Sequence, residues 1–390
     1  MKRKLGWGAL ALLLVAALGL FGIAPAWVDR DLNRIDGAPL PPVSARARAL
    51  HATLEIVDLH SDSLMWQRDL LARHGHGHED LPRMLDGNVA LQVFSSVTKS
   101  PAGLNYDRNS AAARDDITLL AFAQLQPLRT WTSLTERSLF HAARLDRAVA
   151  GSDGRLVKVT APGNLGALRG GTKIGAMLSI EGLHDLEGKA ENLDRLHAAG
   201  FRMAGLTHFF DNELAGSMHG EAKGGLTPFG RRIVRRMEDI GMIVDVAHCS
   251  RACVADVLAM ARRPVISSHG GVQATCRVNR NLTDAEVRGV ARTGGVIGIG
   301  YWDGAVCGTS PRDIATAMKH VRDLVGIGHV ALGSDFDGSV TTRFDAAQLV
   351  QVTQALLDAG FAEDEIRAVM GGNALRVIRA GIAPLAGAAS

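Results

Sequence analysis

A short polar cluster, DLHSD at residues 58–62, follows the apolar pair Ile56 and Val57 near the start of the chain. Residues at i and i+2 of an extended segment point to the same side, so His60 and Asp62 would present an imidazole nitrogen and a carboxylate oxygen together. One divalent cation could bind both groups. Because DxHxD also occurs in solvated loops, a metal site is predicted only if other strands end in the same way.

Similar side chains do follow five later apolar segments. They are histidines and carboxylates without a cysteine among them: Glu181, His208, His248, His269, Asp335 and Asp337. Such sets suit zinc, manganese or iron, and a carboxylate shared by two ions would suit a binuclear centre. Two such ions lower the pKa of a shared water and polarise a carbonyl, which is hydrolase chemistry. The sequence therefore predicts a metal-dependent hydrolase, and no GxSxG indicates a serine nucleophile instead.

Eight short segments rich in Val, Ile and Gly must position these side chains. They are residues 55–60, 88–95, 174–181, 204–209, 241–247, 264–268, 295–301 and 329–334. Segments of helical periodicity lie between most of them, which indicates a parallel sheet covered on both faces. Eight such strands at this chain length predict a (β/α)8 barrel of the TIM type, in which all strand ends converge on the active-site face. A doubly wound sheet is the alternative, but no GxGxxG follows the first strand.

The stretch at residues 96–173 is longer than one connection between strands requires. We expect it to hold two helices, the second near residues 135–150, and then a small excursion at about 154–169. Both would lie outside the regular alternation of the barrel.

The chain begins with MKRK and an apolar run from Leu5 to about Val28. A basic end before an apolar segment is typical of an export signal, and ~20 apolar residues can span a bilayer. We favour an uncleaved anchor over a signal peptide cut after Ala24-Pro25-Ala26, with the remaining chain on the periplasmic or extracellular side. The expected divisions are a signal peptide or membrane anchor at 1–28, a linker at 29–50 ending in a short helix, the barrel at 51–382 and a tail at 383–390.

The charge of the chain argues against a nucleic-acid-binding protein, and its cysteine spacing argues against a structural zinc site. The net charge of +3 resides in Lys2, Arg3 and Lys4, since the remaining chain has 40 basic and 40 acidic residues. A neutral domain offers no electrostatic surface for nucleic acid, so we expect no such partner. The cysteines lack the paired CxxC spacing of a structural zinc site and are expected to be buried free thiols: Cys249, Cys253, Cys276 and Cys307.

Seven motifs, in chain order, resemble the membrane (renal) dipeptidase family of binuclear zinc peptidases: DLHSD, IEG, LTH, DVAH, SSH, RVNRNLTD and LGSDFDG. The resemblance extends from about residue 53 to residue 378 and includes NELAGS, GGLTPFG and GGNALRV. It implies a free dipeptide substrate, including one with a carboxyl-terminal D-residue, two Zn²⁺ per chain and a homodimer. The alternative is a related binuclear-metal amidohydrolase acting on N-acyl amino acids or lactams.

The resemblance also implies five metal ligands. His60 and Asp62 would bind one zinc together with Glu181. Glu181 would bridge to a second zinc, which His248 and His269 complete. A hydroxide between the two metals would then attack the scissile carbonyl.

Three further residues match substrate-binding or catalytic positions of the family. Arg280 would pair with the carboxylate of the substrate, because its planar fork binds such a group bidentately. His208 would stabilise the tetrahedral intermediate. Asp335 would contact the substrate amine and the bridging water and pass a proton to the leaving amine.

We also predict where other polar and aromatic residues near these motifs lie in the structure. Asp58 is expected to orient a ligand or to cap its strand, and Asp337 to support a neighbouring ligand or form a turn. The histidines of HGHGH, residues 74–78, are expected to lie in a solvated loop. Tyr301 and Trp302 could either wall the substrate site or pack in the core.

Overall fold

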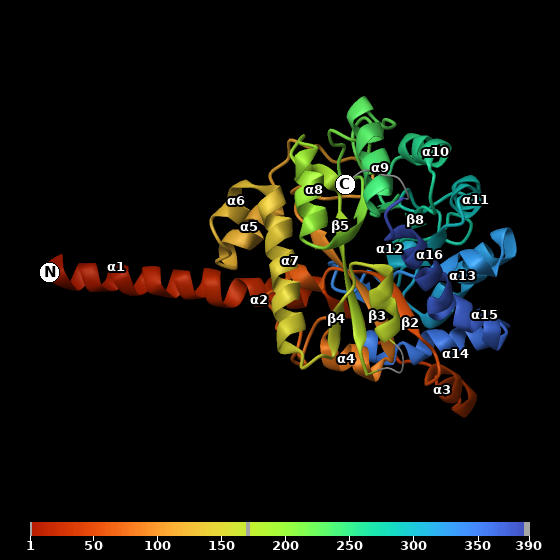
Figure 1. Cartoon of the computed structure of the whole chain (residues 1–390). Helices are drawn as coiled ribbons and strands as arrows, with labels where there is room; N and C mark the ends of the chain where they lie inside the picture. The colour runs from red at the N-terminus through yellow and green to blue at the C-terminus, as the bar shows by residue number, and fades with distance from the viewer. Residues whose placement is uncertain (1, 169–171, 386–390) are drawn as a thin grey trace.

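The computed structural model describes residues 2–168 and 172–385. Eight parallel strands form a closed barrel surrounded by helices (Figure 1). In chain order they are β2 (Ile56–Ser61), β3 (Val89–Val97), β5 (Ile174–Glu181), β6 (Phe201–Gly205), β7 (Ile243–Asp245), β8 (Ile266–Ser267), β9 (Val296–Ile299) and β10 (Val330–Leu332). Each strand pairs with the next, and Leu332 of β10 lies beside Asp58 of β2, which closes the ring. The predicted (β/α)8 barrel is confirmed.

The helices that cover the barrel begin and end at residues suited to those positions. They include α4 (Leu81–Asp86), α7 (Leu134–Gly151), α8 (Glu191–Ala198), α9 (Pro228–Ile240), α10 (Arg251–Met260), α11 (Asp284–Arg292), α13 (Pro311–Val325), α14 (Val350–Asp358), α15 (Glu363–Arg367) and α16 (Asn373–Gly381). At the start of α11, the Thr283 hydroxyl accepts the backbone N–H of Glu286 while the Glu286 carboxylate accepts the backbone N–H of Thr283. Gly241, with φ +77°, ends α9 in the left-handed conformation.

The apolar residues form two main clusters, depending on whether their side chains face the inside or the outside of the barrel. Val57, Leu91, Met177, Met203 and Ile266 belong to the cluster that fills the barrel. The alternate strand residues join the larger cluster between the strands and the helices. Period-two alternation therefore builds both layers and fixes which side chains reach the carboxyl-terminal end of the barrel.

The long stretch between β3 and β5 holds α5 (Asp116–Ala123), α6 (Arg129–Thr132), α7, β4 (Leu156–Lys158) and a 3₁₀ turn at Pro162–Ala167. Strand β4 pairs with the start of β5, Leu156 beside Ile174, and is not part of the closed ring. The second expected helix corresponds to α7. The last residue of the expected excursion, residue 169, lies outside the described residues.

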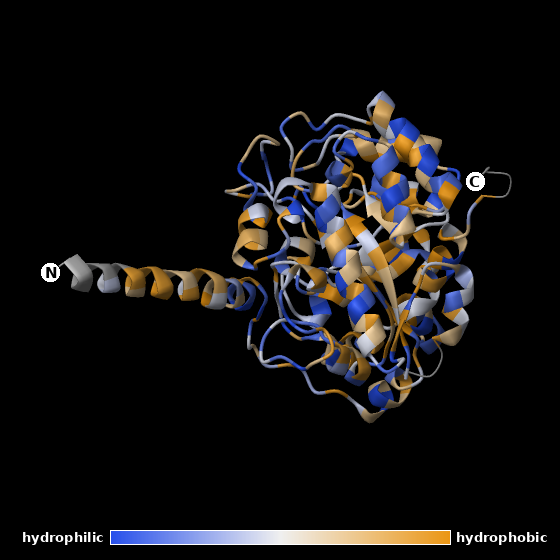
Figure 2. Cartoon of the chain, turned by 60° about the vertical axis from the view of Figure 1, so that its left-hand side comes forward, coloured by the Kyte–Doolittle hydropathy of each residue, from blue (hydrophilic) through white to orange (hydrophobic). Residues whose placement is uncertain are grey.

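The amino-terminal segment forms a helical stalk that projects from the barrel domain (Figures 1 and 2). It consists of α1 (Lys2–Ala17), a π-helical stretch (Leu18–Ile23) and α2 (Ala24–Leu32). The 23 residues Leu10–Leu32 are long and apolar enough to cross a membrane.

The segment predicted as a linker, residues 29–50, lies against the barrel over much of its length. Asp29 and Asn33 are buried, and β1 (Arg34–Ile35) pairs in parallel with β11 (Thr341–Thr342) beyond β10. The segment ends in the expected short helix, α3 (Ala45–His51). Residues 386–390 of the predicted tail lie outside the described residues.

The cysteines follow the free-thiol prediction in part. Cys249 and Cys253 are buried and free. Cys276 and Cys307 form a disulfide, so the prediction is wrong for this pair. The pair lies 31 residues apart in the chain, and the adjacent connections after β8 and β9 bring the two Cα atoms within 5.3 Å. Such a contact between loops leaves no local sequence pattern.

Candidate active site

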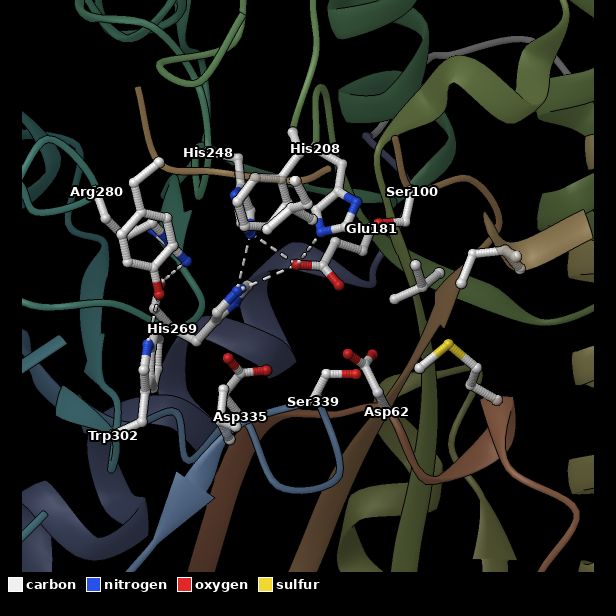
Figure 3. Close-up of a pocket in the computed structure, with 18 of the residues that line it drawn as sticks. Asp62, Ser100, Glu181, His208, His248, His269, Arg280, Trp302, Asp335 and Ser339 are labelled. Carbon is white, nitrogen blue, oxygen red and sulfur yellow. Dashed lines mark hydrogen bonds and ion pairs between the residues drawn. The ribbon is translucent and has the colours of Figure 1, made fainter. Parts of the chain in front are cut away.

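The carboxyl ends of six barrel strands bring all eight predicted site residues together, and Figure 3 labels all of them except His60. Each is buried, with 1–7% of its surface exposed: His60, Asp62, Glu181, His208, His248, His269, Arg280 and Asp335. Seven of them line a cavity of about 340 Å³. His60 lies behind the cavity wall, stacked on the ring of His269 with 3.7 Å between centroids.

Glu181, the last residue of β5, lies at the centre of this arrangement. Its Oε2 atom is 3.4 Å from Nε2 of His60, which in turn is 3.5 Å from Oδ1 of Asp62. Its Oε1 atom is 2.8 Å from Nε2 of His248 and 3.2 Å from Nε2 of His269. The two oxygens of one carboxylate therefore face two separate pairs of ligand atoms, an arrangement suited to a carboxylate shared between two cations.

Several polar atoms in this cluster have no hydrogen-bond partner within the described chain. Both ring nitrogens of His60 and Oδ1 of Asp62 are buried and unpaired. Nε2 of His248 lies only 3.1 Å from Nε2 of His269. Buried polar atoms are normally satisfied, and a divalent cation would satisfy these acceptors. The side chains present therefore fit metal ions.

Distance alone does not separate metal ligands from their neighbours. Three overlapping groups have ligand atoms within 4.8 Å of one another: His60–Glu181–His269, Glu181–His208–His248 and His60–Asp62–Asp335. These groups include His208 and Asp335, which were assigned to catalysis rather than to metal binding. The orientation of the Glu181 oxygens is more selective, because each oxygen is closest to histidines assigned to one metal.

Hydrogen bonds hold the ligand residues in place. The Ser268 hydroxyl lies 2.9 Å from Nδ1 of His269 and donates to Oδ2 of Asp245 at 2.5 Å. Asp58 accepts the backbone N–H groups of His60 and Ser334, which caps the ends of β2 and β10 as expected. Asp245 and Ser268 were not singled out from the sequence, although a polar residue within the apolar segment GMIVDVA is a signal for such a role.

The backbone is strained at the same end of the barrel. His248 and Asp335 adopt positive φ angles of 64° and 63°, and Gly182, directly after Glu181, has φ +89°. Non-glycine residues rarely adopt this conformation, and it costs about 1–3 kcal/mol where it occurs. Such strain is concentrated at functional sites, where the surrounding fold holds side chains in positions that the relaxed backbone would not reach.

The carboxyl groups of the site differ in charge state. Burial alone would raise the pKa of Glu181, but the imidazoles of His208 and His60 and hydrogen bonds from the other histidines hold it well below its usual range. Burial raises the pKa of Asp335 well above its usual range, although His60 opposes this effect. Glu181 is therefore ionised at neutral pH, whereas the protonation of Asp335 responds to the charge beside it. Such a difference suits one metal-binding and one proton-transferring carboxyl group.

Arg280 forms a cationic end of the cavity. Its Nη2 donates to the carbonyl of His269 at 2.8 Å, and its guanidinium lies 5.9 Å from the ring of Trp302. Trp302 donates from Nε1 to the hydroxyl of Tyr106 at 3.0 Å. Trp302 therefore walls the cavity, whereas Tyr301 packs in the core and does not line it. Tyr106 was missed because it lies in the connection after β3, where no periodic pattern marks it.

Apolar side chains form the opposite wall of the cavity. They come from the end of β3, from α5 and from the connections after β2, β3 and β10: Met65, Val97, Leu104, Ile117 and Val340. The cavity thus has a cationic end, a central cluster of histidines and carboxylates, and an apolar side.

The HGHGH loop differs from its prediction as a solvated segment. His78 is fully buried, and its Nδ1 accepts the backbone N–H of Asp337 at 3.0 Å. Asp337 also pairs with Nη2 of Arg68 at 2.8 Å and accepts from Ser63 at 2.8 Å. The prediction for His78 is wrong because its ring lies between Asp337, 259 residues away in the chain, and the carbonyl of Arg34, 44 residues away. Asp337 supports the loop that carries Asp335, as expected.

Comparisons with known proteins agree with this arrangement. The model of the family "Membrane dipeptidase (Peptidase family M19)" matches residues 44–383. The dipeptidase aclJ of Aspergillus oryzae is 30% identical over 401 residues, which cover 97% of this chain and 88% of that protein.

Solved structures show the same fold. The probable dipeptidase PvdM of Pseudomonas aeruginosa has a TM-score of 0.73 at 20% identity, covering 86% of this chain and 98% of that one. A metallo peptidase of Rhodobacter sphaeroides, liganded with a phosphinate mimic of the dipeptide L-Ala-D-Ala, has a TM-score of 0.70 at 20% identity, covering 84% and 99%. Because the family model matches most of this chain, the chain belongs to the membrane dipeptidase family and is a metallo-dipeptidase, a hydrolase that acts on peptide bonds.

Proposed function

We propose that this protein is a binuclear zinc dipeptidase that hydrolyses free dipeptides. The observation that carries the proposal is the position of Glu181, whose two oxygens face His60 on one side and His248 with His269 on the other. His60, Asp62 and Glu181 would hold one Zn²⁺, and Glu181, His248 and His269 the second. The nitrogen and oxygen ligands suit zinc, and no thiolate is required.

When bound, two zinc ions would lower the pKa of a water molecule and polarise the scissile carbonyl. The chain supplies the remaining interactions. The partly unpaired imidazoles and carboxylates around Glu181 form a rigid, buried frame for the ions, because Asp245, Ser268 and Asp58 fix the ligand-bearing strand ends.

His208 and Asp335 would act on the reacting groups of the peptide. Nδ1 of His208 lies 3.3 Å from the carbonyl of Lys99, and Nε2 faces the central cluster, 3.6 Å from Oε1 of Glu181. Burial lowers the pKa of His208, and the Glu181 carboxylate opposes this effect. A proton on Nε2 would let the ring donate a hydrogen bond to a developing oxyanion. Asp335 would accept a proton at its carboxylate and pass it to the leaving amine.

Arg280 at the cationic end of the cavity and Asp335 in the central cluster would recognise the two charges of a free dipeptide. Arg280 would bind the carboxylate, and Asp335 the amine. A longer peptide would place an uncharged amide at one of these groups, so its burial there would leave a charge unpaired. The apolar wall would receive a substrate side chain. The phosphinate ligand of the Rhodobacter sphaeroides enzyme supports including L,D-dipeptides among the substrates.

We further propose that the uncleaved amino-terminal segment, residues 1–28, anchors the protein with its barrel on the periplasmic or extracellular side. A reporter fused to the carboxyl terminus tests this orientation, and a cytoplasmic signal would contradict it. The family resemblance implies a homodimer, which sedimentation of the detergent-solubilised protein tests.

A substrate panel with the zinc-loaded protein tests the dipeptidase function. We expect L,L- and L,D-dipeptides to be hydrolysed and the same dipeptides with an acetylated amine to react far more slowly, because the acetyl group removes the charge that Asp335 recognises. Equal rates for free and acetylated dipeptides would contradict the proposal. Preferential hydrolysis of N-acyl amino acids or lactams would identify the chain as the alternative amidohydrolase.

A further inference from the structure

Where side-chain exposure is defined, large apolar side chains are exposed in two parts of the chain. Among the described residues whose exposure is defined, every such side chain lies within residues 7–35 or residues 104–128. The first part is the stalk and its continuation onto the barrel. The second part belongs to the barrel domain itself, where such a grouping marks an interaction surface rather than random exposure.

The second group is centred on α5 and the turn into α6. Leu119 is 49% exposed, Phe122 36%, Leu125 64% and Leu128 70%. Residues 117–135, ITLLAFAQLQPLRTWTSLT, contain one charged residue, Arg129, and lie between the acids Asp116 and Glu136. We call residues 117–131 the α5–α6 surface. Its composition of leucine, aromatic residues and a single cation is typical of segments that lie in the interfacial region of a bilayer.

The backbone at Leu125 supports a role for this exposure. Leu125 follows α5 with φ +53°, a conformation normally occupied by glycine or asparagine after a helix. A leucine there adds about 1–2 kcal/mol of strain and also leaves its side chain largely in solvent. The side chain does not line the cavity and is 64% exposed, so it is available for contact outside the barrel domain.

The α5–α6 surface is continuous with the stalk. The ring of Phe122 packs edge-on against Phe21 of the stalk with 5.3 Å between centroids. Val28 of α2 packs with Ile117 and Leu120 of α5 against the cluster formed by Met65, Trp66 and Val97. Figure 1 shows α5 and α6 beside the point where the stalk meets the barrel domain. A bilayer that surrounds the stalk would therefore reach this surface first.

We propose that the α5–α6 surface lies in the interface of the same bilayer that the apolar run of the stalk ending at Ile23 spans, because Asp29 beyond it is already buried against the barrel. This inference rests on the proposed membrane anchor and adds a second contact that fixes the orientation of the barrel. Leu125 and Leu128 would enter the headgroup–acyl boundary, and Arg129, which pairs with Glu136 at 3.3 Å, would lie at the level of the lipid headgroups. Because Ile117 of α5 also lines the cavity, the active site would be held close to the membrane surface.

Fluorescence quenching in proteoliposomes tests this contact. The full-length protein is reconstituted in phosphatidylcholine–phosphatidylglycerol vesicles, with or without bromine on the acyl chains, and carries one environment-sensitive fluorophore. The labelled sites are Leu128→Cys on the surface, Leu18→Cys in the stalk and Ala285→Cys on α11, an exposed site on the far side of the barrel from the stalk. The free Cys249 and Cys253 are buried and do not compete for the label.

We expect brominated lipid to reduce the fluorescence at Leu128→Cys and Leu18→Cys by about twofold or more, and to leave Ala285→Cys unchanged. Quenching at Leu18→Cys alone would show an anchored protein whose α5–α6 surface is away from the bilayer, and would overturn the inference. The inference would also be overturned if the fluorescence at Leu128→Cys did not respond to brominated lipid but changed with the density of labelled protein in the vesicles. A second copy of the protein would then cover the surface.

A second variant tests the residues themselves. Combining Leu125→Asn with Leu128→Gln removes both apolar side chains, and asparagine tolerates the left-handed backbone. We expect lower bromolipid quenching of a fluorophore at Leu119→Cys, with dipeptide hydrolysis in detergent unchanged. Unchanged quenching would contradict the inference. Since hydrolysis is measured on the same samples, loss of the membrane contact is distinguished from failure of the proposed dipeptidase function.

Discussion

Replacing Arg280 with methionine should remove recognition of the substrate carboxylate with little loss of volume. Arg280 is 2% exposed, and one N–H group of its guanidinium already donates to the carbonyl of His269. The remaining donors can form two hydrogen bonds to a carboxylate. Each hydrogen bond to a charged partner contributes about 1.5–3 kcal/mol. The variant loses these bonds but also removes the free-energy cost of burying a cation, so the net loss is smaller than their sum.

The expected net loss is about 3 kcal/mol of transition-state stabilisation, or about 150-fold in kcat/KM. The assay compares a free dipeptide with the same dipeptide amidated at its carboxyl terminus. The amidated substrate should be poor for the native protein and nearly unaffected by Arg280→Met. Arg277→Met, three residues away at an exposed position, is the control and should behave as the native protein.

An equal loss for the free and amidated dipeptides would refute the assignment, because the effect would then come from structure rather than from the carboxylate. Native turnover of the amidated dipeptide at the rate of the free acid would refute it as well.

Three further predictions concern stability and metal. Asn33→Ala removes the hydrogen bond that Asn33 donates to Asp29 and the one that it accepts from the backbone N–H of Ser339, a cavity residue. The variant should lower the free energy of unfolding by about 1–2 kcal/mol in urea titrations and raise KM. The control, Arg30→Ala, should change neither the free energy of unfolding nor KM. Burial lowers the pKa of His51 from 6.5 to about 4, so the unfolded chain binds this proton more readily and stability falls as the pH drops through that window. At pH 5 this effect lowers the free energy of unfolding by about 2 kcal/mol. When the urea midpoint is measured at several pH values, the His51→Gln variant should lack this part of the pH dependence. A chelator should abolish hydrolysis and lower the melting temperature, and added Zn²⁺ should restore both; unchanged melting would contradict a metal held by the folded barrel.

The fold and the grouping of the site residues could be predicted because both depend on local patterns. Each apolar segment and the polar residue at its end lie within ten residues of one another, and barrel closure then places those ends on one face. His60 and Glu181 could be assigned to the same site for this reason, although 121 positions separate them.

Contacts that join irregular segments could not be predicted. The burial of His78 depends on Asp337, and the disulfide of Cys276 depends on Cys307, yet neither partner is marked by periodicity or spacing. Tyr106 lines the cavity from a connection whose course is fixed only by tertiary packing. The residues assigned to a linker likewise read as polar, and only the folded structure shows Asn33 buried against the loop that carries Ser339.

Metal analysis of Glu181→Gln tests the central claim most directly. Glutamine keeps the size of the side chain but replaces one anionic oxygen with an amide nitrogen that binds metals poorly. If one carboxylate is shared between two ions, the variant should retain fewer than two Zn²⁺ per chain after dialysis and lose dipeptide hydrolysis. Glu238→Gln, a buried carboxylate paired with Arg262 away from the cavity, should retain the native zinc content. A Glu181→Gln protein that keeps two Zn²⁺ and native activity would contradict the bridging role of Glu181.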